Sequence, residues 1–191
     1  MMKRRRTKIF RRRLVLAVSF TRLCGSTGVA AAATEAETQA AFVKTGDYLY
    51  RTTPQPTFSS IGGEWVIYGL ANAGYEMSDA YLAAYQKEVE KVLTTGYRGV
   101  PGEFHDRATT DYSRVIMAYA AAGLDVTNVA GVNLLDAYAC KERALWQNMN
   151  GPIWVLASLD AGNYAIPQIK EGQEFGGKPA TQNTRQAVVD Y

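Results

Sequence analysis

The chain has 191 residues, of which 47% are hydrophobic and 20% charged, and its formal net charge is +3. Residues 1–33 carry nine of the basic residues and no acid, so residues 34–191 hold 12 Lys or Arg and 18 Asp or Glu, a net charge of −6. This acidic balance argues against a nucleic-acid partner, because the phosphate backbone binds basic surfaces.

Residues 1–33 have the organisation of a secretory signal peptide. The basic segment MMKRRRTKIFRRR precedes the apolar run LVLAVSF, and a stretch of small residues, GVAAAATEA, follows. This order predicts cleavage near Ala33 and a secreted or cell-surface protein. The apolar run is shorter than the roughly 20 residues of a membrane-spanning helix, so no membrane span is expected after cleavage. Only Cys140 then remains, which leaves no intramolecular disulfide.

Apolar residues with helical spacing, bounded by capping residues and glycines, predict seven helices in the rest of the chain. Helix starts are marked by Thr34, which forms a T-x-x-E capping box with Glu37, and by Ser78, Asn150 and Thr184. No segment has the alternation of a strand, so no sheet is expected. The predicted helices cover about residues 34–50, 61–73, 78–95, 110–122, 132–141, 150–161 and 184–191.

Three of these helices repeat one pattern and end at a glycine. Their sequences are GGEWVIYGLANAG, TDYSRVIMAYAAAG and NGPIWVLASLDAG, and the closing residues Gly74, Gly123 and Gly162 are 49 and 39 residues apart. A period of roughly 40–50 residues indicates a helical repeat array, in which each unit packs on its neighbours. The fifth residue before each glycine is small, which we expect to let the repeated helices approach closely: Gly69, Ala118 and Ala157.

The repeated helices are apolar nearly all round, whereas the helix at 78–95 has one apolar and one polar face. A helix that is apolar on all sides is buried on all sides, and an amphipathic helix lies at the surface. The pattern therefore predicts inner and outer helices, arranged as helical hairpins in two layers.

This pattern resembles the terpenoid cyclase/prenyltransferase-like α/α toroid superfamily. The segments that carry the resemblance are GGEWVIYGLANAGY, HDRATTDYSRVIMAYAAAGLDVTNVAG, NLLD and WQNMNGPIWVLASLDAGNYAIP, and they look most like the toroid modules of secreted or surface proteins of Gram-positive bacteria. The resemblance runs from about Ala36 to Tyr191. It implies an all-α domain in residues 34–191, with three helical hairpins and a truncated seventh helix forming about half of an α/α toroid. The remaining half of the toroid is then an expected partner.

The residue types that enzymes of this superfamily use are missing or scattered. No two Asp or Glu are adjacent, which excludes an Asp-rich acid motif, and a catalytic zinc needs three protein ligands. Cys140 is interpreted as a buried apolar residue. His105, beside Asp106, could act as a general base, but we favour a polar loop before a helix whose dipole Asp111 stabilises. Trp146 could stack a ligand, and we favour a packing role. We expect no catalytic residue, metal or cofactor.

Three functions remain open. The favoured one is a secreted, non-catalytic toroid module of a larger extracellular or cell-surface protein, which binds a ligand or a protein partner. The resemblance also allows an isoprenoid- or terpenoid-type enzyme whose catalytic acid lies in the missing C-terminal half. A cobalamin-binding carrier is the third, because B12-transport proteins share this toroid.

A ligand site is expected where the repeated helices begin. The inner helices of an α/α toroid run parallel, so their N-termini lie at one end, and neighbouring packed helices are about 8–10 Å apart. Glu64 and Arg114 can therefore pair, either as part of a ligand site or simply to neutralise charge at crowded helix ends. The expected site has a polar rim of Glu64, Tyr112, Arg114 and Asn150 above an aromatic floor of Trp65 and Trp154.

Overall fold

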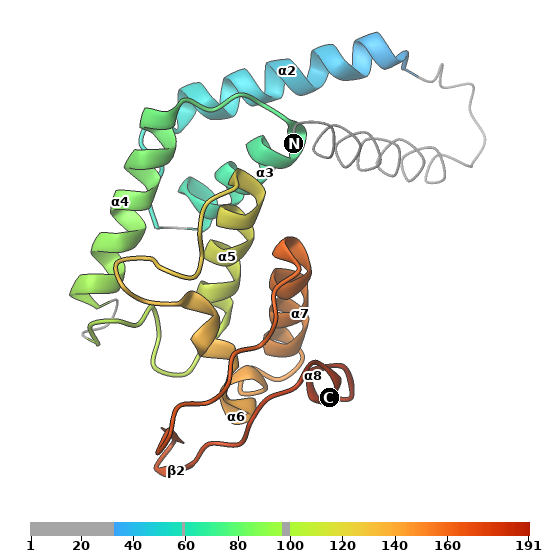
Figure 1. Ribbon diagram of the computed structural model, residues 1–191. Coiled ribbons are helices and arrows are strands. Elements are labelled where there is room, and N and C mark those ends of the chain that lie inside the picture. The colour runs from blue at the N-terminus through green and yellow to red at the C-terminus, as the bar shows by residue number, and fades with distance from the viewer. Residues whose placement is uncertain (1–32, 59, 97–99) are drawn as a thin grey trace, which may run out of the picture. The chain divides into compact units, whose positions relative to one another are not determined.

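The computed structural model describes residues 33–58, 60–96 and 100–191 (Figure 1). The chain divides into two compact units, Met1–Thr38 and Gln39–Tyr191. The predicted signal peptide lies outside the described residues except for its last residue, Ala33. In the first unit the structure therefore describes little more than the first turn of α2 (Glu35–Thr52), and the other elements belong to the second unit.

Helices make up most of the described chain, as the sequence predicts. After α2 come α3 (Glu64–Ala73), α4 (Asp79–Thr95), α5 (Thr110–Ala122), α6 (Lys141–Ala144), α7 (Asn150–Gly162) and α8 (Arg185–Val189), with two 3-10 helices, η1 (Ser60–Gly62) and η2 (Leu134–Tyr138).

The expectation that the chain has no sheet is wrong. Strand β1 (Glu174–Phe175) pairs antiparallel with strand β2 (Lys178–Pro179). The two strands are joined by Gly176 and Gly177, whose φ angles of 61° and 74° are ones that glycine adopts without steric cost. A Gly-Gly pair is a known hairpin signal, but the flanking residues here are too few and too polar to show strand alternation.

The three repeated helices lie side by side, with α5 between α3 and α7 (Figure 1, teal, yellow and orange). Near the N-terminal ends, Arg114 Nε of α5 lies 3.5 Å from Glu64 Oε2 of α3. The rings of Trp65 and Trp154, whose centroids are 5.3 Å apart, join α3 to α7. Helices that pack together with their N-terminal turns as neighbours run in the same direction. The expected parallel packing of the repeats is confirmed, and the toroid itself stays a prediction.

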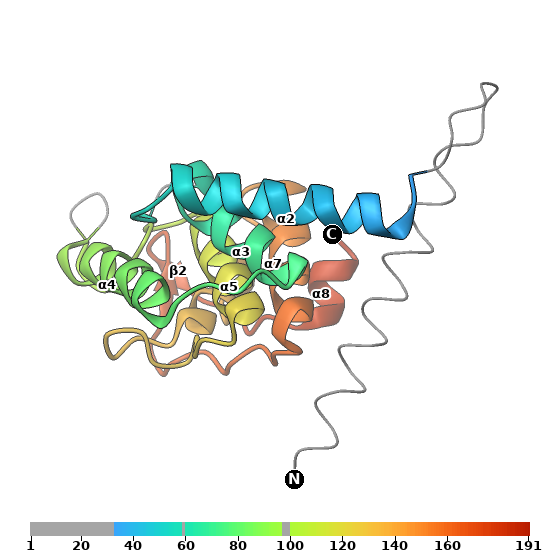
Figure 2. The same ribbon diagram turned by 90° about the horizontal axis from the view of Figure 1, so that it is seen from above.

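α4 is an outer helix, as predicted. Tyr85, Val89 and Leu93 are fully buried on one of its faces, whereas Lys87 on the other face is exposed. The ring of Tyr85 packs edge-on against Tyr119 of α5, with the centroids 5.9 Å apart. Figure 2 shows α4 on one side of α5 and α8 on the other. α5 is therefore covered by other helices, which agrees with its sequence being apolar nearly all round.

A chain of buried hydroxyl groups connects α5 to α7 through η2. Tyr138 Oη lies 2.8 Å from Ser113 Oγ and 2.7 Å from Ser158 Oγ. Each serine hydroxyl also lies within hydrogen-bond distance of a carbonyl of its own helix, Thr109 O at 3.1 Å and Val155 O at 2.9 Å. Because a buried hydroxyl without a partner is costly, this chain favours one spacing of the two helices.

The predicted capping interactions at three helix starts are confirmed. Thr34 Oγ1 accepts a hydrogen bond from Glu37 N at 3.2 Å, while Thr34 N donates to the Glu37 carboxylate at 2.8 Å. The hydroxyls of Ser78 and Thr184 each accept from the backbone N–H three residues further on. Two of the expected glycine stops adopt the left-handed conformation typical of helix ends, Gly74 with φ 70° and Gly123 with φ 75°.

α7 begins and ends differently from the prediction. Asn150 is its first residue rather than its cap, because the preceding Met149 already has helical backbone angles. Gly162 is the last helical residue, and Asn163 adopts the left-handed conformation, with φ 56°. Gly162 is needed for another reason, since the ring of Tyr164 occupies the space that a Cβ would fill.

The prediction of an α-helix over residues 132–141 is wrong. The 3-10 helix η2 occupies residues 134–138, and the backbone that follows pairs with residues 181–183. Lys141 N donates to Thr181 O at 2.9 Å, and Asn183 N donates to Ala139 O at 2.8 Å. These backbone groups find their partners outside the local helix, so a helix is not required to satisfy them.

The expectation that small residues bring the repeated helices together is wrong at Gly69. A Cβ at this position would meet no atom within 4 Å beyond its own helix. Close approach requires glycine elsewhere, at Gly46 of α2, where a Cβ would collide with the ring of Tyr75. Tyr75 is held there because its hydroxyl donates to Asp47 Oδ1 at 2.9 Å.

We expect Gly69→Ala to raise the free energy of unfolding of the full chain by about 0.5–1 kcal/mol, because alanine is preferred to glycine inside a helix and the added methyl finds open space. Urea denaturation measures the change. Gly46→Ala is the matched control and should lower the stability, since its methyl meets the Tyr75 ring. A less stable Gly69→Ala protein would contradict the open position of Gly69.

Candidate functional site

Three aromatic side chains, Trp65, Tyr68 and Trp154, form what we call the aromatic cluster. Trp65 contacts Trp154 with the ring planes inclined by 47°, and it meets Tyr68 edge-on with the centroids 6.0 Å apart. All three side chains are half-buried. Packing therefore holds the rings in place while part of each ring still faces solvent. The structure thus brings the two residues of the expected floor together.

Glu64, expected on the polar rim, is completely buried. Its Oε2 accepts a hydrogen bond from Ser60 N at 2.5 Å and lies 3.5 Å from Arg114 Nε, while Tyr85 Oη donates to its Oε1 at 3.4 Å. Burial raises the pKa of the Glu64 carboxyl, although the Ser60 N–H and the Arg114 charge act in the opposite direction. The carboxylate is surrounded by three elements of the fold and contacts no solvent.

Arg114 is the charged residue of this group that reaches the surface. Its side chain is 20% exposed, and its Nη2 donates to Asp111 Oδ1, one turn earlier on α5, at 2.6 Å. Arg114 therefore lies between the buried carboxylate of Glu64 and the partly buried carboxylate of Asp111. Two carboxylates at these distances hold the long side chain in one orientation. The expected pairing of Glu64 with Arg114 is confirmed.

Tyr112 does not join this group. Its hydroxyl accepts hydrogen bonds from Phe104 N at 3.2 Å and from Arg143 Nη2 at 3.4 Å, and its side chain is almost fully buried. Residues two apart on a helix point to nearly opposite sides, so Tyr112 and Arg114 cannot face the same rim. Burial raises the pKa of the Tyr112 phenol, although the nearby Arg143 charge lowers it.

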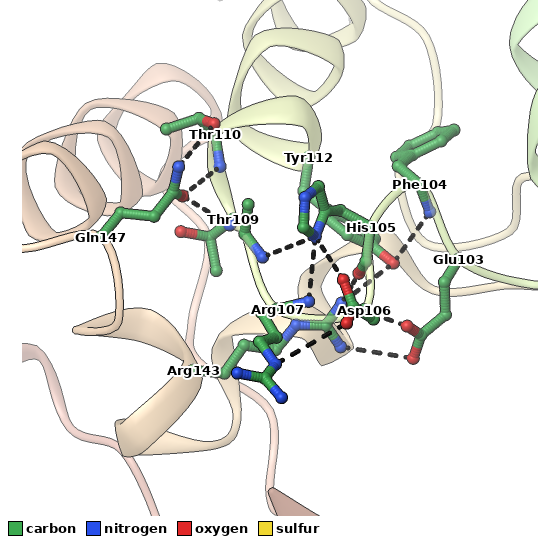
Figure 3. A network of polar contacts seen from close by, with 11 residues as sticks. Glu103, Phe104, His105, Asp106, Arg107, Thr109, Thr110, Tyr112, Arg143 and Gln147 are labelled. Atoms are coloured by element: carbon green, nitrogen blue, oxygen red, sulfur yellow. Dashed lines mark hydrogen bonds and ion pairs between the residues drawn. The ribbon is translucent and has the colours of Figure 1, made fainter. Parts of the chain in front are cut away.

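Arg143 is a central residue of this end of the fold that the sequence did not reveal. Its guanidinium lies 5.1 Å from the centre of the Tyr112 ring and 3.4 Å from Glu103 Oε1, and it donates to His105 O (Figure 3). The side chain is 10% exposed. One buried cation thus attaches the loop around Glu103 to α5 and α6.

Gln147 is a second residue that sequence reasoning missed. Its Oε1 accepts from Thr109 N at 2.8 Å and from Thr110 N at 3.1 Å, and its Nε2 donates to Thr110 Oγ1 at 3.1 Å (Figure 3). Thr109 is the N-cap of α5 and Thr110 is its first residue, so their N–H groups have no partner within the helix. A side chain 37 residues away therefore caps α5.

Asn150, expected on the rim, is exposed at the start of α7.

The structure supports a structural role for His105 in the loop. Its Nδ1 accepts hydrogen bonds from Arg107 N at 3.0 Å and Ala108 N at 3.1 Å (Figure 3). The same nitrogen lies 2.8 Å from Asp106 Oδ1, so Nδ1 is engaged by the backbone of the turn and by the neighbouring carboxylate. Trp146 is 46% exposed, with the Arg107 guanidinium 5.9 Å from its ring centre. The interpretation of Trp146 as a packing residue is therefore wrong, and its ring lies at the surface.

The interpretation of Cys140 as a buried residue is confirmed, because its side chain is only 1% exposed. Burial raises the pKa of the Cys140 thiol. Within residues 33–58, 60–96 and 100–191, no group of three or more His, Cys, Asp or Glu is placed to hold a metal ion. No helix in these same ranges combines the length and the apolar character that a membrane span requires.

Comparison with protein-family models, with curated proteins and with solved structures finds no significant match to this chain.

We expect wild-type protein to lose stability relative to Glu64→Gln as the pH rises above about 4.5. The pKa of Glu64 is higher in the folded than in the unfolded chain. Its contribution is therefore fully present below the unfolded value and is lost as the pH rises through the folded value. The slope has an upper limit of about 1.4 kcal/mol per pH unit.

Urea denaturation of both proteins across the acidic and neutral range measures this difference. Glu90→Gln, at an exposed position on the polar face of α4, controls for the general effect of removing a carboxylate. A stability difference between wild type and Glu64→Gln that stays constant with pH would contradict the assignment.

Proposed function

We propose that residues 34–191 form a secreted, non-catalytic helical module of the α/α toroid type, which binds a ligand or partner protein at the aromatic cluster. The observation that carries this proposal is the meeting of Trp65, Tyr68 and Trp154, half-buried, across α3 and α7. Tryptophan, tyrosine and arginine are the residues that most often dominate binding energy at interfaces, and Arg114 lies on the neighbouring helix.

The buried contacts support this role by holding the binding residues in place. Glu64 precedes Trp65 directly and is fixed by Ser60, Tyr85 and Arg114. The first turn of α3 and the guanidinium of Arg114 are therefore positioned by one buried carboxylate. Residues that are ordered before binding lose less conformational entropy when a ligand arrives.

The non-catalytic part of the proposal rests on what the reactive side chains do. His105 holds a turn through Nδ1, Cys140 is buried with a raised thiol pKa, and Glu64 is enclosed by protein. Each is committed to the fold rather than directed toward a substrate. No observation favours the isoprenoid-type enzyme or the cobalamin carrier over a binding module.

A photocrosslinking residue at position 68 of the full chain tests the binding face. With extracellular material of the source organism, Tyr68→p-benzoylphenylalanine should give a defined adduct that Trp65→Ala with Trp154→Ala removes. The same substitution at Tyr48, exposed on α2, is the control and should give no such adduct. Equal labelling at positions 48 and 68, or labelling that survives removal of both tryptophans, would contradict the proposal.

The secreted location has its own test. Residues 1–40 joined to a reporter enzyme should direct its export, and the exported product should begin near residue 34. Replacing Leu14, Val15 and Leu16 with lysine should keep the reporter inside the cell, because the apolar region is required for recognition. Export that is unchanged by these substitutions would show that residues 1–33 are not the signal.

A further inference from the structure

His105 is the single histidine of the chain, and it lies in the loop before α5. Its Nδ1 accepts hydrogen bonds from Arg107 N at 3.0 Å and from Ala108 N at 3.1 Å, and it also lies 2.8 Å from Asp106 Oδ1 (Figure 3). The side chain is 14% exposed, so the imidazole can exchange protons with solvent. One nitrogen atom thus has two N–H donors and one carboxylate as neighbours.

These neighbours require opposite states of the nitrogen. An imidazole nitrogen without a hydrogen accepts hydrogen bonds, and the same nitrogen with a hydrogen donates one. The N–H groups of Arg107 and Ala108 are satisfied when the hydrogen of the neutral ring is on Nε2. The Asp106 carboxylate only accepts, so it bonds to Nδ1 when that nitrogen carries a hydrogen. Protonation of the ring therefore exchanges one set of partners for the other.

Burial decides which set the neutral ring prefers. Ala108 is 5% exposed, so its N–H has little access to water if Nδ1 ceases to accept from it. The Asp106 side chain is 58% exposed, and water can solvate its carboxylate without the imidazole. The neutral ring is therefore expected to keep Nδ1 as the acceptor.

The charged groups around this loop can accommodate one more positive charge. Arg143 of α6 pairs with Glu103 at 3.4 Å, and Arg107 Nε lies 3.7 Å from Asp106 Oδ2, so two guanidiniums are balanced by two carboxylates. Tyr112 of α5 also contacts Arg143, and burial raises the pKa of its phenol, which keeps this group uncharged. A protonated imidazole therefore meets no excess of cations.

We propose that His105 is a pH-sensitive switch of the loop before α5. The unprotonated ring holds the turn by accepting from Arg107 N and Ala108 N, and the protonated ring donates Nδ1–H to Asp106 and releases both N–H groups. Histidine ordinarily changes its charge between about pH 5 and 8, so mild acid loosens the turn. The change extends to the surface, because the Arg107 guanidinium lies 5.9 Å from the centre of the exposed Trp146 ring. This switch does not depend on the proposed function.

NMR of the full chain without a histidine tag follows the switch, because one histidine gives one set of imidazole signals. The Cε1–H shift measures protonation of the ring, and the ring ¹⁵N shifts show which nitrogen carries the hydrogen. Above the midpoint Nε2 should carry it. As the pH falls, the amide protons of Arg107 and Ala108 should move upfield with the same midpoint, because they lose their acceptor.

Thr127 is the internal control for general effects of acid. Its N–H donates to Asp125 Oδ1 at 2.8 Å in a turn without histidine. Hydrogen bonds from Thr127 lower the pKa of the Asp125 carboxyl, so this acceptor stays charged while His105 titrates. The Thr127 amide proton should therefore not move.

Two substitutions reproduce the two states of the switch. An asparagine Oδ1 is bonded to Cγ as the histidine Nδ1 is, and it accepts from the backbone two residues ahead without titrating. His105→Asn should therefore keep the Arg107 and Ala108 amides near their neutral positions down to about pH 5. His105→Ala removes the acceptor and should give the acid positions even at about pH 8.

Three results would each overturn the proposal. They are an Nδ1–H ring above the midpoint, amide protons of Arg107 and Ala108 that stay fixed while the ring titrates, and a pH dependence of these amides that persists in His105→Asn. If His105→Ala fails to fold, the comparison of wild type with His105→Asn decides alone.

Discussion

The burial of α5 is the constraint on which the described fold depends. Seven of its residues, from Tyr112 to Tyr119, are buried, and helices α3 and α7 pack on either side of it. Side chains from elsewhere in the chain complete its surroundings. Gln147 caps its first turn, Arg143 covers the Tyr112 ring, and Tyr85 of α4 packs on Tyr119. Side chains from before and after α5 in the chain therefore converge on this helix.

The three repeated helices share a buried position near their start, but a different type of side chain occupies it in each helix. The tenth residue before each closing glycine is Glu64, Ser113 or Pro152, and all three are buried. Glu64 is held by an ion pair, Ser113 by a hydroxyl contact with Tyr138, and Pro152 has no N–H to satisfy. The three helix starts are therefore stabilised by different interactions. Only the start of α3 depends on an ionisable carboxyl group, so the three starts differ in their sensitivity to pH.

Local sequence signals located the helices because caps and glycine stops act within a few residues. Ser78 and Gly74 perform their roles through contacts with their own helices, so the sequence carries the whole signal. The same is true of the apolar face of α4. The contact between Trp65 and Trp154 was also expected, although the two residues lie nine and eight positions before their closing glycines and their helices pack on opposite sides of α5.

Contacts between distant segments could not be predicted in this way. Arg143 and Gln147 reach α5 from 31 and 37 residues away, and nothing in their own surroundings marks them as partners of that helix. The expected helix at 132–141 failed for the same reason, because its backbone pairs with residues 181–183. The prediction that Tyr112 lies on the polar rim failed for another reason. Tyr112 and Arg114 are two residues apart on one helix, so their side chains point to nearly opposite sides.

The hydroxyl chain between α5 and α7 has a consequence for the motion of protons. Ser113, Tyr138 and Ser158 supply three hydroxyl hydrogens to four contacts, the two between hydroxyls and the two with Thr109 O and Val155 O. One contact is therefore always without a hydrogen, and rotation of a single hydroxyl moves that deficit to the next contact. The donor in each hydroxyl–hydroxyl contact can be either oxygen, so one arrangement of heavy atoms at the centre of the fold is compatible with more than one arrangement of hydrogens.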